Sequence, residues 1–466
     1  MHTGGSSALD IAGATESIPA PEGLSYLPYQ LEAIRFMLAR EGVLVGDEMG
    51  LGKTVEVIGL INTLPSDGRI LIVCPATIRL VWKMELEKWL LTKRPIQIIK
   101  RADEVFSTDK SAIIIINYDK AYQYRSQLLG ELWSLVIADE CHYLRNAETK
   151  RSSVVLATKA RRRVALSGTP LESRPVELRP VLTWLDSVAW PLNKWHEYGL
   201  RYCRGFWDGF KFDFSGASHL DELNQRLRDT VMIRRLKAHM LPQLPAKFRS
   251  IVELSPSTDL QVLLQDELDA FTRWQEHKSE DGYKAQVADL KVYSPTKTPE
   301  NLARLRQQVA LAKAPMVAAY ARELFKGGVK KLVIFAHHHS VVSFLAKALT
   351  EYCPGIITGE TSLGLREQVL TRLHEDPACR LFIGNIQAAG TGITLAPAAN
   401  HCLFAEFSWL PSQMSQAEDR LHRVGTRDNV LAQYMVLSGS LDAIMAKILL
   451  KKQEVLDSVL APVWRL

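Results

Sequence analysis

The stretch GVLVGDEMGLGKT, residues 42–54, decides the fold of the first half of the chain. Its apolar start is typical of a buried strand, and the segment VEVIGLIN that follows is typical of a helix. Glycines between a strand and a helix let backbone N–H groups surround phosphate, while a lysine reaches the terminal phosphates and a hydroxyl ligates Mg²⁺. The stretch therefore predicts an ATP-binding loop, in which Thr54 also binds Mg²⁺. The residues expected to contact ATP here are Asp47, Gly50, Leu51, Gly52, Lys53 and Thr54.

The loop departs from the strict phosphate-loop pattern G-x-x-x-x-G-K-T, because Asp47 stands where that pattern has its first glycine. A glycine-rich turn with a chance Lys-Thr pair is the alternative interpretation. A nucleotide site also needs an acidic pair at the end of another strand, and VIADECH, residues 136–142, supplies one. Asp139 is expected to hold Mg²⁺ through water, and Glu140 to orient and deprotonate the attacking water. The alternative for this acidic pair is a solvated turn.

Apolar runs of strand length recur in both halves of the chain. The first set is GVLVG, RILIVCP, SAIIIIN, WSLVIADE and RRRVALSG, and the second is KKLVIFAHH, GIITG, CRLFIGN, ANHCLFAEF and LAQYMVL. Short buried strands separated by helix-length stretches predict parallel sheets covered by helices. Between about residues 171 and 330, aromatic and charged segments show helical spacing and few strand signals. We therefore expect an α/β protein of two parallel-sheet lobes with helical insertions.

The length of 466 residues exceeds a single ordinary core and suits two domains. The polar, turn-rich part from SEDGYKAQ to SPTKTPEN is expected to be the most mobile loop. The expected organisation is a disordered leader over 1–22, a first lobe with a helical insertion over 23–245, a helical insertion and connection over 246–322, and a second lobe over 323–466.

Composition narrows the class of protein. Hydrophobic residues make up 47% and charged residues 23%, and no apolar run approaches the roughly 20 residues that cross a bilayer, so a membrane role is excluded. The net charge of +6 permits a polyanionic partner without proving one. Six cysteines without a C-x-x-C pair predict reduced core thiols. The first twenty residues lack a signal-peptide pattern, so the expected location is the cytoplasm of a prokaryotic or virus-infected cell, or the nucleus if the source is eukaryotic.

The motifs DEMGLGKT, DECH, LSGTP and QAEDRLHRVG occur in the order in which superfamily-two motors of the Swi/Snf family carry them. The chain resembles that family from about Tyr26 to about Val455. Within it, FAHH, ITGET and FAEFSWLPSQMSQAEDRLHRVG are most similar to the HARP-type annealing-helicase subgroup. The resemblance implies two RecA-like parallel-sheet lobes with an ATP cleft between them.

The resemblance also assigns roles to residues around the first lobe. Tyr29 and Gln30, in LPYQ, are similar to the element that reads adenine, and a helix start without a ligand is the alternative. The segment 167–170, SGTP, resembles the motif that relays the nucleotide state to the nucleic-acid side. Arg234 and Arg235 resemble the element that braces the closed lobes, and they could equally touch DNA.

The segment QAEDRLHR in the second half contains Gln416, Arg420 and Arg423 as candidate catalytic residues. Arginines three residues apart lie on one face of a helix, so both are expected to point across the cleft at the γ-phosphate. An arginine finger of this kind accelerates phosphoryl transfer by roughly 10³-fold to 10⁵-fold. The alternative is a solvated basic helix. Gly425-Thr426 follows where the family more often has Gly-Gln, and the effect of this change is left open.

A translocating motor should grip phosphates with both lobes through residues just past strand ends. The alternative for each such residue is a capping or turn role. Trp409 lies in a strand-end loop, and the resemblance implies that it couples DNA contact to hydrolysis, with a hydrophobic anchor as the alternative. Trp82 and Trp89, seven residues apart, are expected to pack in the core. The other candidate DNA contacts are Thr77, Arg79, Asn117, Thr358, Gly390, Thr391 and Thr394.

The resemblance implies a DNA-dependent ATPase that uses ATP and Mg²⁺ and translocates on double-stranded or branched DNA, remodelling DNA structures or protein–DNA complexes. Fork remodelling or strand annealing would fit this class. One alternative is a conventional helicase that separates DNA or RNA strands, and another is a nucleotide-gated DNA-binding scaffold. The chain is expected to act as a monomer, with a protein partner for targeting.

Overall fold

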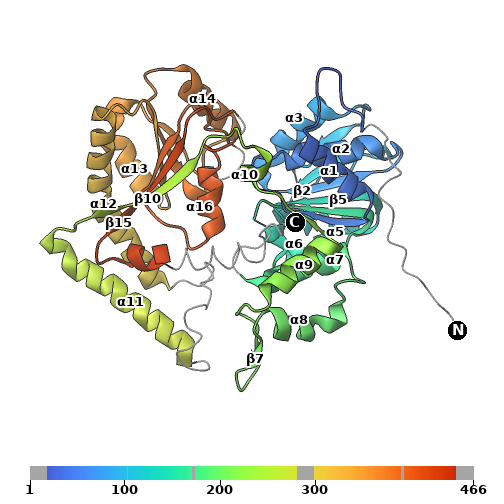
Figure 1. Ribbon diagram of the computed structural model, residues 1–466, viewed down its shortest axis with the longest axis horizontal. Coiled ribbons are helices and arrows are strands. Elements are labelled where there is room, and N and C mark those ends of the chain that lie inside the picture. The colour runs from blue at the N-terminus through green and yellow to red at the C-terminus, as the bar shows by residue number, and fades with distance from the viewer. Residues whose placement is uncertain are drawn as a thin grey trace.

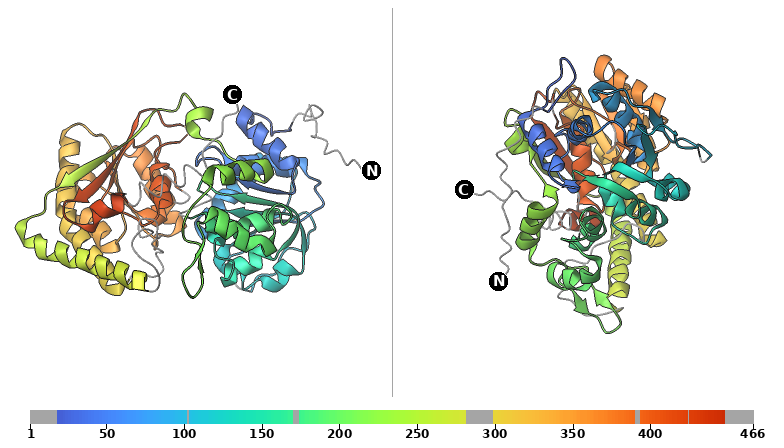
Figure 2. Two further views of the ribbon diagram at one scale, coloured as in Figure 1. Left: turned by 60° about the horizontal axis from the view of Figure 1, so that its bottom comes forward. Right: turned by 90° about the vertical axis from the view of Figure 1, so that its right-hand side faces the viewer.

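The computed structural model describes residues 18–101, 103–169, 174–280, 299–389, 393–423 and 425–447. Figure 1 shows two α/β lobes side by side, one from each half of the chain, and the left view of Figure 2 shows the same arrangement from another direction. Most of the leader predicted over 1–22, and most of the mobile loop predicted from SEDGYKAQ to SPTKTPEN, lie outside the described residues.

The first lobe is built on a sheet of seven strands in the order β3-β4-β2-β5-β6-β1-β9, and every neighbouring pair is parallel. All five apolar runs predicted as strands in this half are strands, so that prediction is confirmed. Alternate residues of the sheet enter two different cores, as expected for a sheet covered by helices on both faces. The strands are β1 (Gly42–Val45), β2 (Ile70–Cys74), β3 (Ile96–Ile98), β4 (Ile113–Asn117), β5 (Leu132–Asp139), β6 (Lys159–Leu166) and β9 (Met232–Ile233).

Helices connect these strands and cover the sheet. Because Gly42 has no side chain, Leu185 at the end of α7 can approach the start of β1, where a Cβ atom would lie 2.0 Å from the Leu185 carbonyl oxygen. The helices are α1 (Pro28–Leu38), α2 (Lys53–Thr63), α3 (Arg79–Trp89), α4 (Tyr118–Ala121), α5 (Arg125–Leu129), α6 (Lys150–Leu156) and α7 (Arg179–Leu185).

The region after α7 is mainly helical, as predicted, with α8 (Trp195–Tyr202), α9 (Leu220–Thr230) and the short α10 (Lys237–Met240). It also contains an antiparallel hairpin of β7 (Phe206–Trp207) and β8 (Phe212–Asp213), which the sequence did not predict. Directly after α9 the chain returns to the first sheet as β9, whose two residues are too few to show a strand pattern.

The second lobe has a six-stranded sheet in the order β10-β15-β14-β11-β13-β12, again parallel throughout. The five predicted strands of this half are confirmed. The sixth, β10, comes from the segment expected to be a helical insertion and connection. Its sequence KFRSIVEL lacks a buried apolar run, because many of its side chains are exposed at the edge of the sheet. The strands are β10 (Lys247–Leu254), β11 (Leu332–Ala336), β12 (Gly355–Ile357), β13 (Leu381–Asn385), β14 (His401–Phe404) and β15 (Val430–Leu437).

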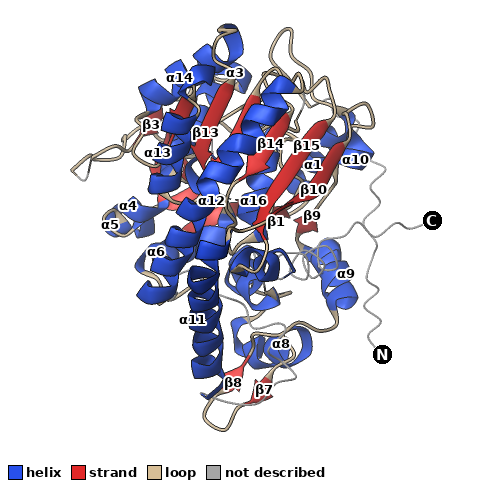
Figure 3. Cartoon of the chain, turned by 90° about the vertical axis from the view of Figure 1, so that its left-hand side faces the viewer, coloured by secondary structure: helices blue, strands red, loops and turns tan. Residues whose placement is uncertain are grey.

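Long helices flank the second sheet. Figure 3 shows α11 extending toward the end of the molecule that also carries the β7–β8 hairpin. The helices are α11 (Gln261–Glu280), α12 (Glu300–Lys326), α13 (His339–Ala348), α14 (Leu363–Glu375), α15 (Ile386–Ala389) and α16 (Pro411–Glu418). Short 3₁₀ turns are η2 (Ala76–Ile78), η3 (Cys141–Leu144), η4 (Pro175–Leu178), η5 (Leu192–Lys194), η6 (Thr258–Leu260) and η9 (Thr350–Tyr352).

Two further expectations concern membranes and thiols. Among the described residues, no helix combines the length and apolar character needed to cross a membrane. The six cysteines are unpaired, and all but Cys353 are buried, which agrees with the prediction of core thiols for five of them.

Candidate active site

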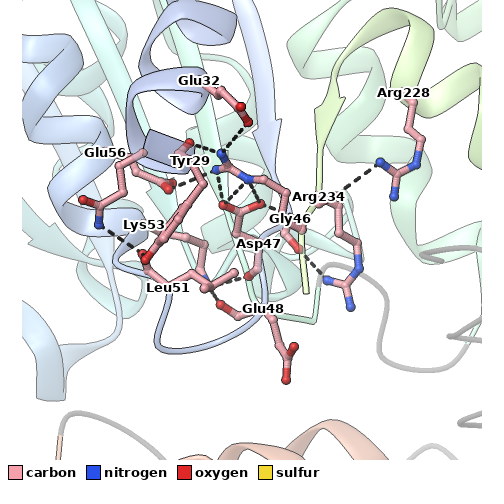
Figure 4. A network of polar contacts seen from close by, with 12 residues as sticks. Tyr29, Glu32, Gly46, Asp47, Glu48, Leu51, Lys53, Glu56, Arg228 and Arg234 are labelled. Carbon is pink, nitrogen blue, oxygen red and sulfur yellow. Dashed lines mark hydrogen bonds and ion pairs between the residues drawn. The ribbon is translucent and has the colours of Figure 1, made fainter. Parts of the chain in front are cut away.

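The predicted phosphate loop connects β1 to α2. Gly52 has a φ of +90°, which favours glycine, and a Cβ atom there would lie 2.5 Å from Nε2 of Gln30. Lys53 begins α2, and its Nζ donates a hydrogen bond to the backbone carbonyl of Asp47 at 2.7 Å (Figure 4). Thr54 follows in the first helical turn and is partly exposed. The loop thus folds around the lysine amine next to a helix N-terminus, which is a geometry that binds phosphate.

Tyr29 and Gln30 reach the same loop from the start of α1. The Tyr29 hydroxyl donates to the carbonyl of Leu51 at 3.0 Å, and Nε2 of Gln30 donates to that carbonyl at 3.2 Å. Oε1 of Gln30 accepts a hydrogen bond from the backbone N–H of Leu27 at 2.9 Å. Both side chains therefore form a wall of the loop, and their role in reading adenine stays a prediction.

Asp47, predicted to contact ATP, turns its buried carboxylate to the back of the loop. The carboxylate accepts hydrogen bonds from the backbone N–H of Arg235 at 2.9 Å and from Nε of Arg235 at 3.0 Å. Arg235 also donates to Oε1 of the buried Glu56 at 3.0 Å. Burial, followed by the negative charge of Asp47, raises the pKa of Glu56. Only the backbone of Asp47 faces Lys53, so its carboxylate holds the loop in shape.

Replacing Arg235 with methionine is expected to destabilise the first lobe by about 3 to 5 kcal/mol, because the Asp47 carboxylate then stays buried without a counter-charge. Urea-induced unfolding of the full chain measures the effect. A double variant, Arg235→Met with Asp47→Asn, is the control, and it should recover part of the loss. An equal loss in the single and double variants would show that the charge of Asp47 is not the cause.

The acidic pair lies at the end of β5, facing the phosphate loop. Oδ2 of Asp139 accepts a hydrogen bond from Nε1 of Trp82 at 2.8 Å, and Oδ1 accepts one from the backbone N–H of Glu140 at 2.8 Å. Burial, followed by the charge of Glu140, raises the pKa of Asp139 to about 7. A cation at this position would favour the charged form, so the residue fits the Mg²⁺ role predicted for it. Trp82 is buried as predicted, and it also orients this carboxylate.

Glu140 adopts a left-handed conformation with a φ of +53°, which is uncommon for a residue with a side chain and often marks a functional site. Its Oε2 lies 3.3 Å from Nδ1 of His142 and accepts a hydrogen bond from Oγ of Ser167 at 3.2 Å. Burial opposes the charge on Glu140, but the hydrogen bond and charge of His142 outweigh it, so the pKa of Glu140 lies below its usual value. The carboxylate is therefore charged at neutral pH, as the base for a water molecule must be.

Hydrogen bonds continue from Glu140 toward the second lobe. The Oγ of Ser167 also accepts from the backbone N–H of Thr169 at 3.1 Å. Oγ1 of Thr169 accepts from Nε2 of Gln416, on α16, at 3.5 Å. The Ser-Gly-Thr segment thus joins the acidic pair to the other lobe, which fits the relay role predicted for it. Pro170, the last residue of that motif, lies outside the described residues.

The prediction that Arg420 and Arg423 share a helix face is wrong, because α16 ends at Glu418 and both arginines lie in the turns that follow. Nζ of Lys247 pairs with the carboxylates of Glu418 at 3.0 Å and Asp419 at 3.2 Å. Glu418 and Asp419 are consecutive, and the side chains of consecutive residues in a helix point in different directions. Lys247 can therefore contact both carboxylates more easily because the helix ends at Glu418. Residues 419–426 are called the finger loop below.

The finger loop nevertheless places both arginines at the cleft. A Cβ atom on Gly50 of the phosphate loop would lie 3.4 Å from the Cβ of Arg423. His142 and then Lys53 lower the pKa of Glu140, and the positive charge of Arg420 adds a smaller lowering from the second lobe. Burial, followed by the charge of Arg423, lowers the pKa of Arg420 to about 10, so its guanidinium is still charged at neutral pH. The two halves of the predicted site therefore face each other.

Thr426, the departure from the family pattern, has a structural role in the finger loop. Its hydroxyl donates to the carbonyl of Leu421 at 2.7 Å and accepts from the backbone N–H of Arg423 at 3.1 Å. It follows Gly425, whose φ is +99°. The threonine therefore closes the turn that carries Arg423.

The first-lobe residues predicted to contact DNA lie at strand ends. Thr77 is in η2 after β2, and Arg79 begins α3, where its Nη1 donates to the carbonyl of Ile99 at 2.7 Å. Asn117 ends β4, and its buried Oδ1 has no hydrogen-bond partner within the described part of the chain. These positions are compatible with phosphate contacts, and the contacts themselves stay predictions.

The second-lobe candidates are less uniform. The backbone N–H of Thr358, after β12, donates to Oγ1 of Thr361 at 2.9 Å, which is a turn contact. Oγ1 of Thr394 accepts a hydrogen bond from Nη1 of Arg423 at 2.7 Å, so this hydroxyl touches the finger loop. Gly390 and Thr391 lie outside the described residues.

Trp409 is buried, with 7% of its surface exposed. Its ring centroid lies 6.2 Å from that of Phe271 and 6.0 Å from that of Trp274, both on α11. The guanidinium of Arg306, from α12, lies 4.6 Å from its ring centroid. Trp409 therefore joins α11 and α12, which flank the second sheet, to the start of α16, and any coupling to DNA would act through that packing.

Two parallel-sheet lobes that face each other across a phosphate loop define the class of this molecule: it is a helicase-like, ATP-hydrolysing enzyme of superfamily two. The SNF2-related domain family matches residues 29–309, and the helicase conserved C-terminal domain family matches residues 316–425. The chain belongs to the SNF2-related family, which confirms the resemblance seen in its motifs.

Curated relatives support the same assignment. The DNA annealing helicase and endonuclease ZRANB3 of Bos taurus is 35% identical over 451 residues, covering 93% of this chain and 40% of that protein. The SWI/SNF-related matrix-associated actin-dependent regulator of chromatin subfamily A-like protein 1 of Xenopus tropicalis is 31% identical over 439 residues, covering 93% of this chain and 45% of that protein. The chain thus spans less than half the length of these relatives.

Among solved structures, the Sulfolobus solfataricus SWI2/SNF2 ATPase core in complex with dsDNA matches with a TM-score of 0.45 and 19% identity. The match covers 95% of this chain and 98% of that one.

Proposed function

We propose that this chain is a DNA-dependent ATPase that translocates on double-stranded DNA and remodels branched DNA or protein–DNA complexes. The observation that carries the proposal is the position of the finger loop, which brings Arg423 over Gly50 of the phosphate loop. Hydrolysis then requires closed lobes, and product release lets them separate, so each ATP cycle would move one lobe relative to the other.

Within the closed cleft, Lys53 would bind the terminal phosphates, and Thr54 and Asp139 would hold Mg²⁺. Mg²⁺ held by these two residues would supply positive charge that offsets the negative charge developing on the phosphates. Glu140, ionised and held by Ser167, would orient the attacking water and accept its proton. Arg420 and Arg423 would stabilise the charge that builds on the transferred phosphoryl group.

The choice of DNA as substrate rests on the relatives and on the candidate contacts. One relative is named a DNA annealing helicase and endonuclease. In this chain, polar residues at the ends of β2, β4 and β12 offer phosphate contacts on both lobes. Backbone contacts of this kind grip DNA without reading its sequence, as a motor that moves along the duplex must do.

Trp409 gives a prediction about coupling. Trp409→Ala is expected to leave ATP hydrolysis without DNA within about twofold and to lower its stimulation by duplex DNA at least about tenfold, because the start of α16 loses its packing against α11. Steady-state hydrolysis with and without DNA measures both values. Trp409→Phe, which keeps an aromatic ring against Phe271 and Trp274, is the matched control and should retain most of the stimulation. Unchanged stimulation in the alanine variant would reduce Trp409 to a packing residue.

The experiment that tests the proposed function is steady-state ATP hydrolysis by the full chain at fixed salt. The additions are none, single-stranded DNA, linear duplex DNA, forked DNA and duplex RNA. Strong stimulation by duplex or forked DNA is expected. Stimulation by single strands or RNA alone would indicate a conventional helicase, and no turnover with any of them would indicate a nucleotide-gated scaffold.

A further inference from the structure

The segment between the last strand of the first sheet and the first strand of the second sheet carries the basic residues Arg234, Arg235 and Lys237. Arg234 donates hydrogen bonds to the carbonyls of Gly46 and of Gly168, the latter at 3.2 Å. Arg235 is bound to Asp47, as described above. These bonds fix the segment to the strand end that begins the phosphate loop.

Lys237 differs because it is attached to both lobes. Its backbone N–H donates to the carboxylate of Glu48, in the phosphate loop, at 2.7 Å. Its Nζ donates to Oδ1 of Asp419 at 2.9 Å and to the carbonyl of His422 at 2.8 Å, both in the finger loop. The side chain is 2% exposed, so these contacts are shielded from solvent. One residue therefore connects the phosphate loop to the loop that carries the arginines.

Further contacts surround the connection that Lys237 makes between the phosphate loop and the finger loop. A Cβ atom on Gly50 would lie 3.3 Å from Cε of Lys237, so the aliphatic stem passes directly beside the phosphate loop. Nε2 of His422 donates to the carbonyl of Pro245, downstream in the same connecting segment, at 2.7 Å. The finger loop is thus held at two points by the chain between the lobes. Burial opposes the charge on Asp419, but Lys237 and then Lys247 outweigh it and hold the pKa of Asp419 well below its usual value.

We propose that Lys237 is a positioning residue for ATP hydrolysis, which holds Asp419 so that Arg420 and Arg423 face the phosphate loop only when that loop is correctly formed. This inference rests on the proposed function. Nζ of Lys53 donates to the carbonyls of Asp47 and Glu48 at 2.7 and 3.4 Å. A nucleotide phosphate that draws Lys53 away changes the surroundings of Glu48, and the change passes through the backbone of Lys237 to the finger loop.

The test compares Lys237→Met, Asp419→Asn and the double variant with the unmodified chain, all with saturating duplex DNA. For Lys237→Met, kcat is expected to fall at least about tenfold while KM for ATP stays within about threefold, because Lys237 positions the arginines and does not hold the nucleotide. The double variant should be no slower than the slower single variant, since both changes break one contact. Lys237→Met should fold, because Asp419 keeps Lys247 at 3.2 Å as its counter-charge.

Arg249→Met is the matched control. Arg249 pairs with Glu418 at 2.6 Å, and both residues belong to the second lobe, so kcat should stay within about twofold. A kcat for Lys237→Met within about twofold of the unmodified chain, or a parallel change of KM and kcat, would overturn the proposal.

A second readout separates this proposal from the proposed function. Cys353, the one exposed cysteine, and a cysteine introduced at the exposed Val105 of the first lobe accept a pair of fluorescent dyes. A non-hydrolysable ATP analogue is expected to raise energy transfer between the dyes in the otherwise unmodified chain but not in the Lys237→Met background. If no DNA stimulates hydrolysis, the proposed function fails while this measurement still decides the role of Lys237. Equal closure in both backgrounds would overturn that role.

Discussion

Replacing Arg423 with alanine is expected to lower kcat for ATP by about 10³-fold to 10⁵-fold in the presence of duplex DNA, with little change in ATP affinity. The reason is its position. A Cβ atom on Gly50 would lie 3.4 Å from the Cβ of Arg423. Nη1 of Arg423 donates a hydrogen bond to Oγ1 of Thr394 at 2.7 Å. The stem of Arg423 therefore lies beside the phosphate loop, and we expect its guanidinium to turn from Thr394 toward the charge that develops during phosphoryl transfer. Single-turnover and steady-state hydrolysis measure the loss.

The matched control for Arg423 is Arg427→Ala, because Arg427 is exposed and lies four residues further along the chain. Its replacement should leave kcat within about twofold. Turnover by the Arg423 variant at a rate near that of the Arg427 variant would remove Arg423 from the catalytic residues and leave the finger role to Arg420, whose charge already acts on Glu140.

Replacing Lys53 with alanine is expected to lower kcat by at least about 10²-fold to 10³-fold, because the terminal phosphates lose the cation that stabilises them. Affinity for duplex DNA should stay within about threefold, since the candidate phosphate contacts belong to other residues at strand ends. Hydrolysis assays and DNA binding by fluorescence anisotropy, at one salt concentration, measure the two effects.

Lys326→Ala controls for the loss of a positive charge. Lys326 lies at the end of α12, its side chain is 71% exposed, and it pairs with the nearby Glu323 at 2.8 Å. Both activities should survive its replacement. If Lys53→Ala weakened DNA binding as strongly as it weakened hydrolysis, the lysine would belong to a shared site and the separation of ATP and DNA contacts would be wrong.

The parallel strands were predictable because they are buried on both faces, and a short run of β-branched residues such as IIIIN at 113–117 is typical of a strand in that position. The strands that escaped prediction lack that signal. β9 has two residues, and β10 mixes polar and apolar residues without regular alternation at the edge of its sheet. Their pairing depends on where the rest of the chain brings them, which periodicity along the sequence does not contain.

The candidate site was predictable where one segment supplies both the residue and its context. Lys53 follows a strand and a glycine-rich loop and begins a helix, and Asp139 ends a strand. The position of each residue in the fold could therefore be predicted from the adjacent sequence. Contacts across the sequence were not predictable in this way. The bond from Trp82 to Asp139 spans 57 positions, and that from Lys237 to Asp419 spans 182. The i, i+7 spacing of Trp82 and Trp89 indicated burial correctly but contained no information about the indole N–H.

The finger arginines show a different limit. Spacing of three residues favoured a shared helix face, yet the helix ends before Arg420 because the chain turns where Glu418 and Asp419 meet buried basic residues. The Cβ of Arg423 still lies beside Gly50 of the phosphate loop, and the contact of both arginines with a γ-phosphate stays a prediction. The order of the motifs predicted which segments form the site. The conformation of the segment that carries the arginines depends on the ion pairs of Glu418 and Asp419, which the sequence did not reveal.

Movement along intact duplex DNA is tested most directly by displacement of a third strand bound in the major groove of a linear duplex. With ATP, the unmodified chain is expected to release the third strand while the two duplex strands stay paired, and Lys53→Ala should release none. Retention of the third strand during active ATP hydrolysis, or its release only when the duplex strands separate, would contradict translocation on double-stranded DNA.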